Sequence, residues 1–465
     1  MDEYIPLGKP SYPLTLNLPK AEALLISYCE RPELGSLIHR LLTKAEVFLV
    51  GGAVRDALLA QESKDIDLAV SISPNEVRTT LEPHGFRVIS TGEEHGTLTI
   101  LADEESIEVT TFRKPSSRYA NEFGSSITED LSGRDFTINA IAYDCRAKSF
   151  IDPFQGLSDL ASGVCRAVGD PSERFQEDPL RLLRFVRFGS ASGRTSDQAT
   201  EYAARELAHS ISGVSVERIQ HELVSLLSLP YPGDALKHLY TLGLLSELIP
   251  EMLASVGCEQ NEFHIHDVFD HTAWVLDRSP SSDIVRLACL LHDIGKPKSL
   301  SIGDGGRRHF YNHERIGAEM AAAILDRLKF SKQTNRRVTR LVREHMRPLD
   351  CGPAGVRRIL RDLEEDFDLW LAVKRSDPPP VMPQEEFETQ YNAFLLLVNE
   401  ELERRKEPAY GRLAINGNDL IMLGVSPGPR LGTILKAIEE IVIEDPSQNE
   451  KSNLLSIAKK ILEEG

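Results

Sequence analysis

A short apolar run that ends in two glycines is the feature that most constrains how this chain can fold. Residues 48–50 lead into Gly51 and Gly52, a pattern typical of a buried strand that enters a tight turn. Backbone N–H groups in such a turn can approach phosphate oxygens closely. Arg55 follows and adds guanidinium donors beside the turn. The pattern therefore predicts a strand and turn that bind a phosphate group.

Two aspartates, Asp65 and Asp67, come soon after this turn. In a predicted strand over 65–70 they project from the same face, because strand side chains alternate with a period of two residues. Adjacent carboxylates repel each other unless a cation lies between them, and oxygen ligands beside a phosphate favour Mg²⁺ over zinc. This arrangement is typical of phosphoryl or nucleotidyl transfer. The alternative is a polar turn in which the spacing arose by chance.

A third carboxylate, Glu108, lies in a predicted strand over 106–111. If that strand pairs beside 65–70, Glu108 completes a site of three carboxylates; otherwise it is an exposed strand residue. Further along, Arg134 is suited to hold triphosphate oxygens, whereas Asp135 and Asn139 are suited to bind sugar hydroxyls and so favour ribonucleotides. The alternative for this second block is the start of an element capped by Asp135.

A third block, residues 177–184, contains Asp178, Arg181 and Arg184, which we predict on one side of a helix that starts near Pro179. An aspartate can accept from the exocyclic amine of a base while an arginine donates to the neighbouring ring nitrogen. Cytosine and adenine match this pattern, and guanine and uracil present the reverse. The alternative is a salt bridge between Asp178 and Arg181.

The composition is that of a globular protein. At 465 residues, with 41% apolar and 27% charged residues, the chain is expected to form about three or four domains. We expect no membrane span, since no apolar run reaches about 18 residues. The N-terminus lacks a signal peptide pattern, and the six cysteines show no paired spacing, which together favour the reducing cytoplasm. The net charge of −18 argues against a nucleic-acid partner, but arginines cluster locally and leave RNA binding open.

The order of these blocks, with residues 217–223 after them, resembles the class II tRNA nucleotidyltransferase and bacterial poly(A) polymerase superfamily. The resemblance implies an α+β chain: a small α/β head of the DNA polymerase beta type, followed by helical neck, body and tail. It also implies transfer of CMP and AMP from CTP and ATP to the tRNA 3′ end. The catalytic residues would be Asp65, Asp67 and Glu108, with Mg²⁺ on the two aspartates. The nucleotide would be bound by Gly51, Gly52, Arg55, Arg134, Asp135, Asn139, Asp178, Arg181 and Arg184. Many relatives carry a second arginine where this chain has Gly133.

Histidines and aspartates recur in a helical region further on, at His271, His292, Asp293, His313, His345 and Asp377. Mixed nitrogen and oxygen ligands of this kind suit one or two divalent metals, and a metal-bound water hydrolyses phosphate esters. Residues 290–296 resemble the HD phosphohydrolase superfamily, which implies a transition metal such as Ni, Mn, Co or Fe. The alternative for any single histidine is a core or surface residue. His264, His266 and His309 have no assigned role.

The predicted elements divide the chain into five parts. Strands are expected over 47–50, 65–70, 96–101, 106–112 and 138–144, and helices over 21–40 and 74–85. The parts are an N-terminal leader (1–45), the head (46–165), a helical neck and body (166–255), an HD domain (256–380) and a helical tail (381–465). No sequence feature predicts an oligomeric state.

Four functions remain open at this point. The favoured one is addition or repair of C-C-A at the tRNA 3′ end, and the second is a poly(A) polymerase. A third is an RNA-binding protein with an inactive head. The fourth is an enzyme that adds only the two cytidines, or only the adenosine. The resemblance implies that relatives which complete C-C-A carry a flexible loop here that helps the site switch from C to A. In this chain the connection over 113–132 is a few residues short and lacks their usual pattern, which suggests addition of cytidines alone.

Overall fold

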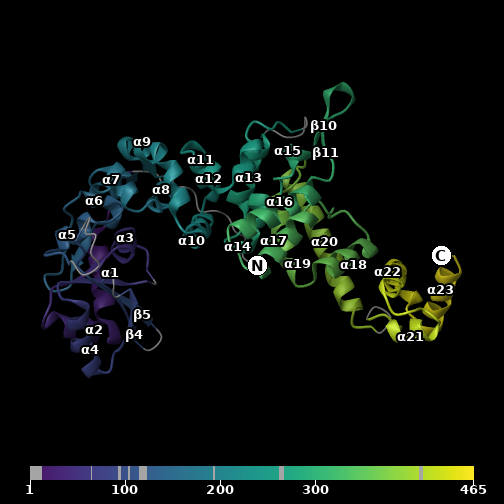
Figure 1. Ribbon diagram of the computed structural model, residues 1–465, viewed down its shortest axis with the longest axis horizontal. Helices are drawn as coiled ribbons and strands as arrows, with labels where there is room; N and C mark the ends of the chain where they lie inside the picture. Colours follow the sequence, from purple (N-terminus) through teal and green to yellow (C-terminus); the bar gives the residue numbers. More distant parts are fainter. Residues whose placement is uncertain are drawn as a thin grey trace. The chain divides into compact units, whose positions relative to one another are not determined.

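The computed structural model describes residues 13–63, 65–92, 96–102, 105–114, 123–191, 194–260, 266–407 and 412–464. The chain forms two compact units, residues 1–253 and 254–465, whose elements are labelled in Figure 1. The first unit contains the sheet, and the second is largely helical. The predicted α+β class is therefore confirmed.

A seven-stranded sheet forms the framework of the first unit, in the order β3-β4-β5-β2-β1-β6-β7. Only β2 and β5 pair in parallel, and the other neighbours are antiparallel. The parallel register places Asp67 opposite Glu108. The strands are β1 Val47–Val50, β2 Asp67–Val70, β3 Arg87–Gly92, β4 Thr97–Ala102, β5 Glu105–Thr111, β6 Ala142–Asp144 and β7 Ser149–Ile151.

One face of this sheet is closed by a hydrophobic cluster. Phe48 and Val50, two residues apart in β1, share one face of the sheet and pack with Ala69, Phe112 and Leu131. Leu131 comes from helix α5, Ile127–Ser132. The remaining helices of the N-terminal half of this unit are α1 Leu18–Cys29, α2 Pro32–Leu42, α3 Gly52–Leu58, α4 Pro74–Leu81 and α6 Gly156–Ser162. The cluster fixes β1 and β2, and with them the turn and the aspartates.

Several predicted boundaries were wrong, for local reasons. The strand expected over 65–70 begins only at Asp67. The helix expected over 21–40 is broken before Pro32, because the residue that precedes a proline is driven into an extended conformation. The strand expected over 138–144 starts with a 3₁₀ turn, Thr137–Asn139, before β6. Strands β3 and β7 were not predicted.

The rest of the first unit is mostly helical. A two-stranded parallel ribbon pairs β8 Val164–Cys165, which precedes these helices, with β9 Thr195–Ser196, which lies between α8 and α9 in sequence. The helices are α7 Pro171–Glu177, α8 Arg181–Gly189, α9 Gln198–Glu206, α10 Val216–Leu227, α11 Pro232–Thr241 and α12 Leu244–Leu248.

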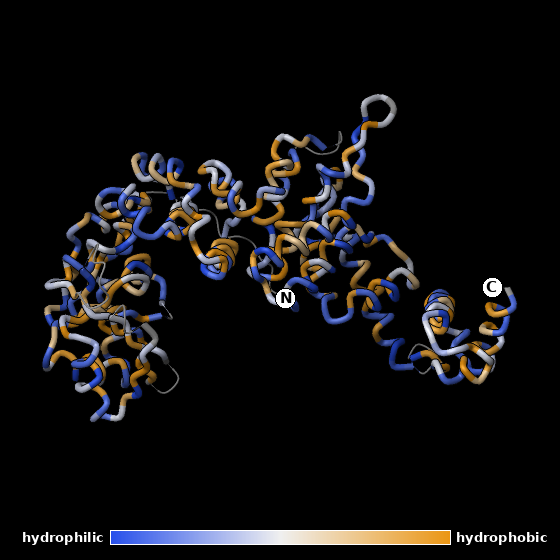
Figure 2. The backbone as a smooth tube through the Cα atoms, viewed as in Figure 1, coloured by the Kyte–Doolittle hydropathy of each residue, from blue (hydrophilic) through white to orange (hydrophobic). Residues whose placement is uncertain are grey.

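The second unit is built from amphipathic helices and one hairpin. Hydrophobic and hydrophilic stretches alternate along its helices in Figure 2, and in α17 the buried side chains are Val338, Leu341 and Val342. The hairpin is β10 Leu300–Ile302 with β11 Arg308–Phe310. The helices are α13 Val268–Arg278, α14 Asp283–Leu291, α15 Lys296–Ser299, α16 His313–Arg327, α17 Lys332–Glu344, α18 Pro353–Leu363, α19 Phe367–Ser376, α20 Gln384–Arg404, α21 Gly417–Met422, α22 Pro429–Glu444 and α23 Lys451–Glu464. Among the described residues, none of the helices combines the length and the apolar character that a bilayer crossing needs.

Candidate nucleotide site and metal centre

The glycine turn after β1 brings the backbone into close contact with charged side chains. Gly51 has φ +70° and ψ −133°, a conformation that favours glycine. A Cβ atom at Gly51 would lie 3.2 Å from Asp67 Oδ2 and 3.2 Å from Arg134 Nη1. The turn predicted from the sequence is therefore present, with one acidic and one basic side chain against it.

The carboxylates of the head lie on neighbouring strands. Asp67 opens β2, and Glu108 is its partner in β5. Asp65 precedes the strand and is exposed. Burial raises the pKa of Asp67, and the negative charges of Glu108 and Asp65 raise it further against the opposing charge of Arg134. These oxygen donors repel one another, which is the environment that a hard divalent cation stabilises.

Arg134 is held by an acid that sequence reasoning missed. Asp130 is fully buried in α5 and pairs with Arg134 at 3.2 Å. Asp130 also accepts from the Arg113 backbone N–H at 3.0 Å. Burial alone would raise the pKa of Asp130, but the charges of Arg134 and Arg113 lower it overall. The four-residue spacing from Asp130 to Arg134 was the only sequence signal for this pair.

Asp135 and Asn139, the predicted sugar-binding residues, belong to a hydrogen-bond network. Asp135 is buried, and its Oδ2 lies 2.6 Å from Arg184 Nη2. Asp135 Oδ1 accepts from Asn139 Nδ2 at 3.0 Å, and Asn139 Oδ1 accepts from Arg55 Nη1 at 2.8 Å. Four of the predicted nucleotide-binding residues are thus brought together. Their role in binding stays a prediction.

Asp178 and Arg181 do not lie on one helix as predicted. Helix α7 ends at Glu177 and α8 begins at Arg181, because Asp178, which precedes Pro179, is extended. The alternative salt bridge between the two is also wrong. Asp178 pairs with Arg218 of α10 at 2.8 Å, whereas Arg181 pairs with Glu177 at 2.8 Å.

Gly133, the position where many relatives carry arginine, binds Arg181 through its backbone carbonyl. Arg181 Nη2 donates to the Gly133 carbonyl oxygen at 3.1 Å. This hydrogen bond joins the segment of Arg134, Asp135 and Asn139 to the segment 177–184, at the position where this chain departs from the family pattern. Whether Asp178 and Arg181 read the base stays a prediction.

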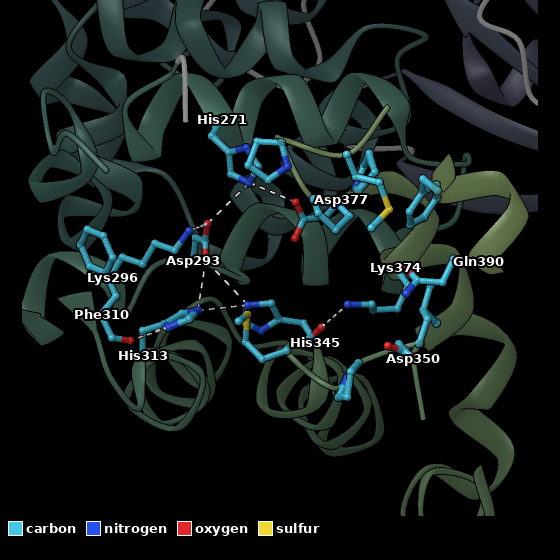
Figure 3. Close-up of a pocket in the computed structure, with 18 of the residues that line it drawn as sticks. His271, Asp293, Lys296, Phe310, His313, His345, Asp350, Lys374, Asp377 and Gln390 are labelled. Carbon is cyan, nitrogen blue, oxygen red and sulfur yellow. Dashed lines mark hydrogen bonds and ion pairs between the residues drawn. The ribbon is translucent and has the colours of Figure 1, made fainter. Parts of the chain in front are cut away.

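The predicted metal ligands of the second unit converge at helix ends (Figure 3). His271 lies in α13, His292 follows α14, and His313 begins α16. His345 and Asp377 follow α17 and α19 directly. All four histidines and Asp293 are buried. The histidines are therefore gathered in one buried cluster rather than exposed on the surface, and their role as metal ligands stays a prediction.

Asp293 lies between two groups of ligands. Its Oδ2 is 3.2 Å from His292 Nε2 and 3.6 Å from His271 Nε2. Its Oδ1 is 3.4 Å from His313 Nε2 and 3.7 Å from His345 Nε2. Each group has the spacing of a metal site. Asp377 completes the first group, with Oδ1 3.2 Å from His271 Nε2.

Backbone carbonyls fix which nitrogen of each ring faces the centre. The Nδ1 atoms of His292, His313 and His345 lie 2.7, 2.8 and 2.7 Å from the carbonyl oxygens of Cys289, Phe310 and Val342. A carbonyl only accepts, so each Nδ1 carries the proton and each Nε2 is left as the ligand atom. The Nε2 atoms of His313 and His345 are 3.3 Å apart. When both rings are neutral their lone pairs face each other, and a shared cation relieves that repulsion.

The charges of the centre also fit cations. Burial alone would raise the pKa of Asp293, but His292 and Lys296 hold it well below the usual range. Among the described residues no hydrogen-bond donor of suitable geometry reaches Asp293 Oδ2, although Lys296 Nζ forms an ion pair with it at 2.6 Å. Burial lowers the pKa of His313 and keeps that ring neutral for ligation. The residues present therefore fit two metal ions that share Asp293.

A cavity of about 550 Å³ opens beside the ligands. Lys296 and Lys374 contribute positive charge, and Lys374 Nζ donates to the His345 carbonyl oxygen at 3.0 Å. Aromatic and other apolar side chains form the rest of the wall, among them Phe310, Tyr311, Met346 and Phe387. The cavity is large enough for a small organic phosphate.

Comparisons with known proteins decide the family. The chain matches the poly(A) polymerase head domain over residues 47–166 and the HD domain over 240–376. It is 32% identical to the A-adding tRNA nucleotidyltransferase of Deinococcus radiodurans over 405 residues, which covers 84% of this chain and 90% of the relative. The chain belongs to the tRNA nucleotidyltransferase family.

Other members of this family extend the comparison. The CCA-adding enzyme of Levilactobacillus brevis is 31% identical, over 88% of this chain and 93% of that enzyme. The Bacillus stearothermophilus CCA-adding enzyme, solved in complex with CTP, superposes with a TM-score of 0.67 at 25% identity and covers 93% of this chain and 98% of its own. The resemblance inferred from the sequence motifs is thereby confirmed for the tRNA nucleotidyltransferase and for its HD domain.

The contact of Gly51 with Asp67 and Arg134 is testable. Gly51→Ala should lower the free energy of unfolding by about 1–3 kcal/mol because of its backbone conformation, and it should also reduce nucleotidyl transfer by displacing both side chains. Gly85 is a matched control, with φ +90° and nothing within 4 Å of a Cβ. Gly85→Ala should cost stability but leave transfer unchanged, as measured by denaturant unfolding and incorporation of labelled nucleotide. Equal transfer in the two variants would contradict the proposed contact.

The HD metal centre is testable without any activity. The rings of Trp274 and His271 stack with centroids 6.0 Å apart, so Co²⁺ or Ni²⁺ at this centre should quench Trp274 fluorescence. The chain has two tryptophans. Quenching should persist in Trp370→Phe, in which Trp274 is the remaining tryptophan, and elemental analysis should find two transition-metal ions per chain. One ion or none would contradict the shared role of Asp293.

Proposed function

We propose that the head of this enzyme transfers CMP and AMP from CTP and ATP to the 3′ end of tRNA. The observation that carries the proposal is the close approach of Asp67 and Arg134 to the Gly51 turn, with Glu108 in register beside Asp67. A site that joins carboxylates to a phosphate-binding turn and a buried arginine suits a nucleoside triphosphate with its cation. The B. stearothermophilus enzyme bound to CTP, and a Thermotoga maritima enzyme of the same fold solved with tRNA (20% identity, TM-score 0.58), support these substrates.

The chain's own residues divide the work of this transfer. Asp65 and Asp67, with Glu108 beside them, would hold Mg²⁺, which supplies charge stabilisation at the triphosphate. Arg134, fixed by Asp130, and Arg55, fixed by Asn139, would bind the phosphate oxygens. The terminal hydroxyl oxygen of the tRNA bonds to the α-phosphorus and gives up its proton to water. The bond from the α-phosphorus to the bridging oxygen breaks at the same time, and pyrophosphate leaves. Asp178 and Arg181 would read the base, with Arg218 holding the Asp178 carboxylate.

The extent of synthesis has two supported candidates. Addition of the whole C-C-A is the first, since CCA-adding enzymes are about 31% identical over most of the chain. Addition of adenosine alone is the second, favoured by the 32% identity to the A-adding enzyme of D. radiodurans. The expectation of cytidines alone depended on the connection over 113–132, of which residues 115–122 lie outside the described residues.

Three tRNA substrates separate these candidates. A tRNA that lacks C-C-A, one ending in a single C and one ending in C-C should all gain a complete end with CTP and ATP if the first candidate is correct. An A-adding enzyme would extend only the third, a CC-adding enzyme would stop before the adenosine, and a poly(A) polymerase would add repeated adenosines.

The same assay tests the carboxylates. Asp67→Ala should lower transfer by more than about 100-fold, because even the partners of a metal ligand are worth 10–100-fold. Glu62→Gln is the matched control, since Glu62 is an exposed acid in the same connection, and it should transfer normally. Near-normal transfer by Asp67→Ala would contradict the proposed site.

For the HD centre we propose hydrolysis of phosphate esters. The two ligand groups around Asp293 and the neighbouring cavity with Lys296 and Lys374 carry this proposal. When bound, the metal pair supplies an activated water and polarises the phosphate. Lys296 and Lys374 would balance the negative charge of the ester, and the apolar wall would exclude bulk water from the cavity.

This second activity should be separable from the first. Asp293→Asn should abolish hydrolysis of bis(p-nitrophenyl) phosphate by Mn²⁺- or Ni²⁺-loaded protein, because it removes the carboxylate that both groups share. CMP transfer by the same variant should be unchanged. If the native protein binds transition metal but hydrolyses neither phosphomonoesters nor phosphodiesters, the hydrolase proposal is wrong.

A further inference from the structure

Three arginines of the first unit converge on one aromatic ring, that of Phe188 in α8. The guanidinium carbon of Arg187 lies 4.3 Å from the ring centroid, that of Arg55 lies 5.1 Å away, and that of Arg184 lies 5.4 Å away. Phe188 is buried, with 6% of its surface exposed. Two of these arginines, Arg55 and Arg184, are predicted nucleotide-binding residues. They come from α3 and α8, so the ring joins the phosphate-binding turn to the helical part of the unit.

Each of these arginines already has an acidic partner. Arg55 pairs with Asp56 at 2.7 Å, Arg184 with Asp135 at 2.6 Å and Arg187 with Glu222. The ring is therefore not required to neutralise them. The cations nevertheless crowd one another: burial lowers the pKa of Arg55, and the charges of Arg194 and Arg187 lower it further. An additional attraction to a shared group would offset the repulsion between these guanidiniums and keep them close together.

An aromatic ring supplies such an attraction. The negative face of the ring attracts a guanidinium from above, so its in-plane N–H groups can donate to other partners at the same time. The Phe188 ring is itself fixed by Phe136, which is fully buried and packs edge-on with a centroid distance of 5.8 Å. Asn139 joins Arg55 to Asp135, the partner of Arg184. The positions of both predicted nucleotide-binding arginines, Arg55 and Arg184, thus depend on one ring and one network.

We propose that Phe188 is a positioning residue for nucleotidyl transfer, which holds Arg184 together with Arg55, the arginine beside the glycine turn, before the nucleoside triphosphate binds. This inference rests on the proposed function of the head. The ring touches no substrate and acts through the two guanidiniums. Its negative face, rather than its bulk, is the property that the site requires.

A series of fluorinated phenylalanines at position 188 separates these two properties. One, two or three fluorines progressively remove the negative potential of the ring face while its shape changes little. KM for both CTP and ATP should rise stepwise, reaching roughly tenfold with the trifluorinated ring, because two cation–π contacts weaken together. The kcat value should change little, since the lost interaction is made in the ground state and the transition state alike.

Phe185 offers a matched control in the same helix. It is fully buried, and its described ring partners are Phe136, Phe175 and His238 rather than a guanidinium. The same series at position 185 should leave KM unchanged. A flat KM series at position 188, or equal shifts at both positions, would overturn the role of Phe188.

Two simple variants keep the test decisive if a fluorinated protein folds poorly. Phe188→Leu and Phe185→Leu each remove a buried ring, and thermal unfolding shows what each loses in stability. Only Phe188→Leu should raise KM for the nucleotides, and equal KM values at comparable stability would contradict the proposal. If the native enzyme transfers no nucleotide, the proposed function itself is wrong and this inference falls with it; transfer with an unresponsive Phe188 refutes the inference alone.

Discussion

The parallel pairing of β2 with β5 is the constraint on which the head site depends. That register sets Asp67 opposite Glu108 in a sheet whose other neighbours are antiparallel. Two carboxylates so placed repel each other, and both the Gly51 backbone and the Arg134 guanidinium lie close to Asp67. The hydrophobic cluster beneath the sheet holds the strands in place against this repulsion. The carboxylates of the head therefore repel one another, and binding of a cation together with a triphosphate would relieve that repulsion.

The HD centre follows the same logic with different ligands. Backbone carbonyls take the Nδ1 proton of three histidines, so their Nε2 atoms are forced toward Asp293. In the head the groups that repel one another are carboxylate oxygens, whereas in the HD centre they include the lone pairs of imidazole nitrogens. Hard oxygen ligands suit Mg²⁺, whereas mixed nitrogen and oxygen ligands suit transition metals. The two candidate centres of this chain therefore differ in ligand type: carboxylate oxygens in the head, and imidazole nitrogens together with carboxylate oxygens in the second unit.

Much of this architecture could be predicted from local sequence, and the errors have identifiable causes. The strand before Gly51 and the helical character beyond Pro179 follow from hydrophobic periodicity and glycine. The predictions passed over the helix break at Pro32, and at Pro179 they placed the preceding residue, Asp178, on the helix. In both places the residue before proline avoids helical geometry. The break at Pro179 released Asp178 from the helix of Arg181 and allowed it to reach Arg218.

The sequence by itself determined the chemistry that is available: the Gly51 turn, the aspartates, and the ordered histidines of the HD centre. These signals are local, because a turn, a strand alternation or a helix end depends on neighbouring residues. Only the tertiary structure decided which groups meet. Packing buries Asp130 against Arg134, although the four-residue spacing of this pair is itself local. The pairing of Asp178 with Arg218 and the approach of Arg55 to Phe188 join distant segments whose contact is set by packing. Such partners depend on strand register and helix packing, and no spacing along the chain encodes them.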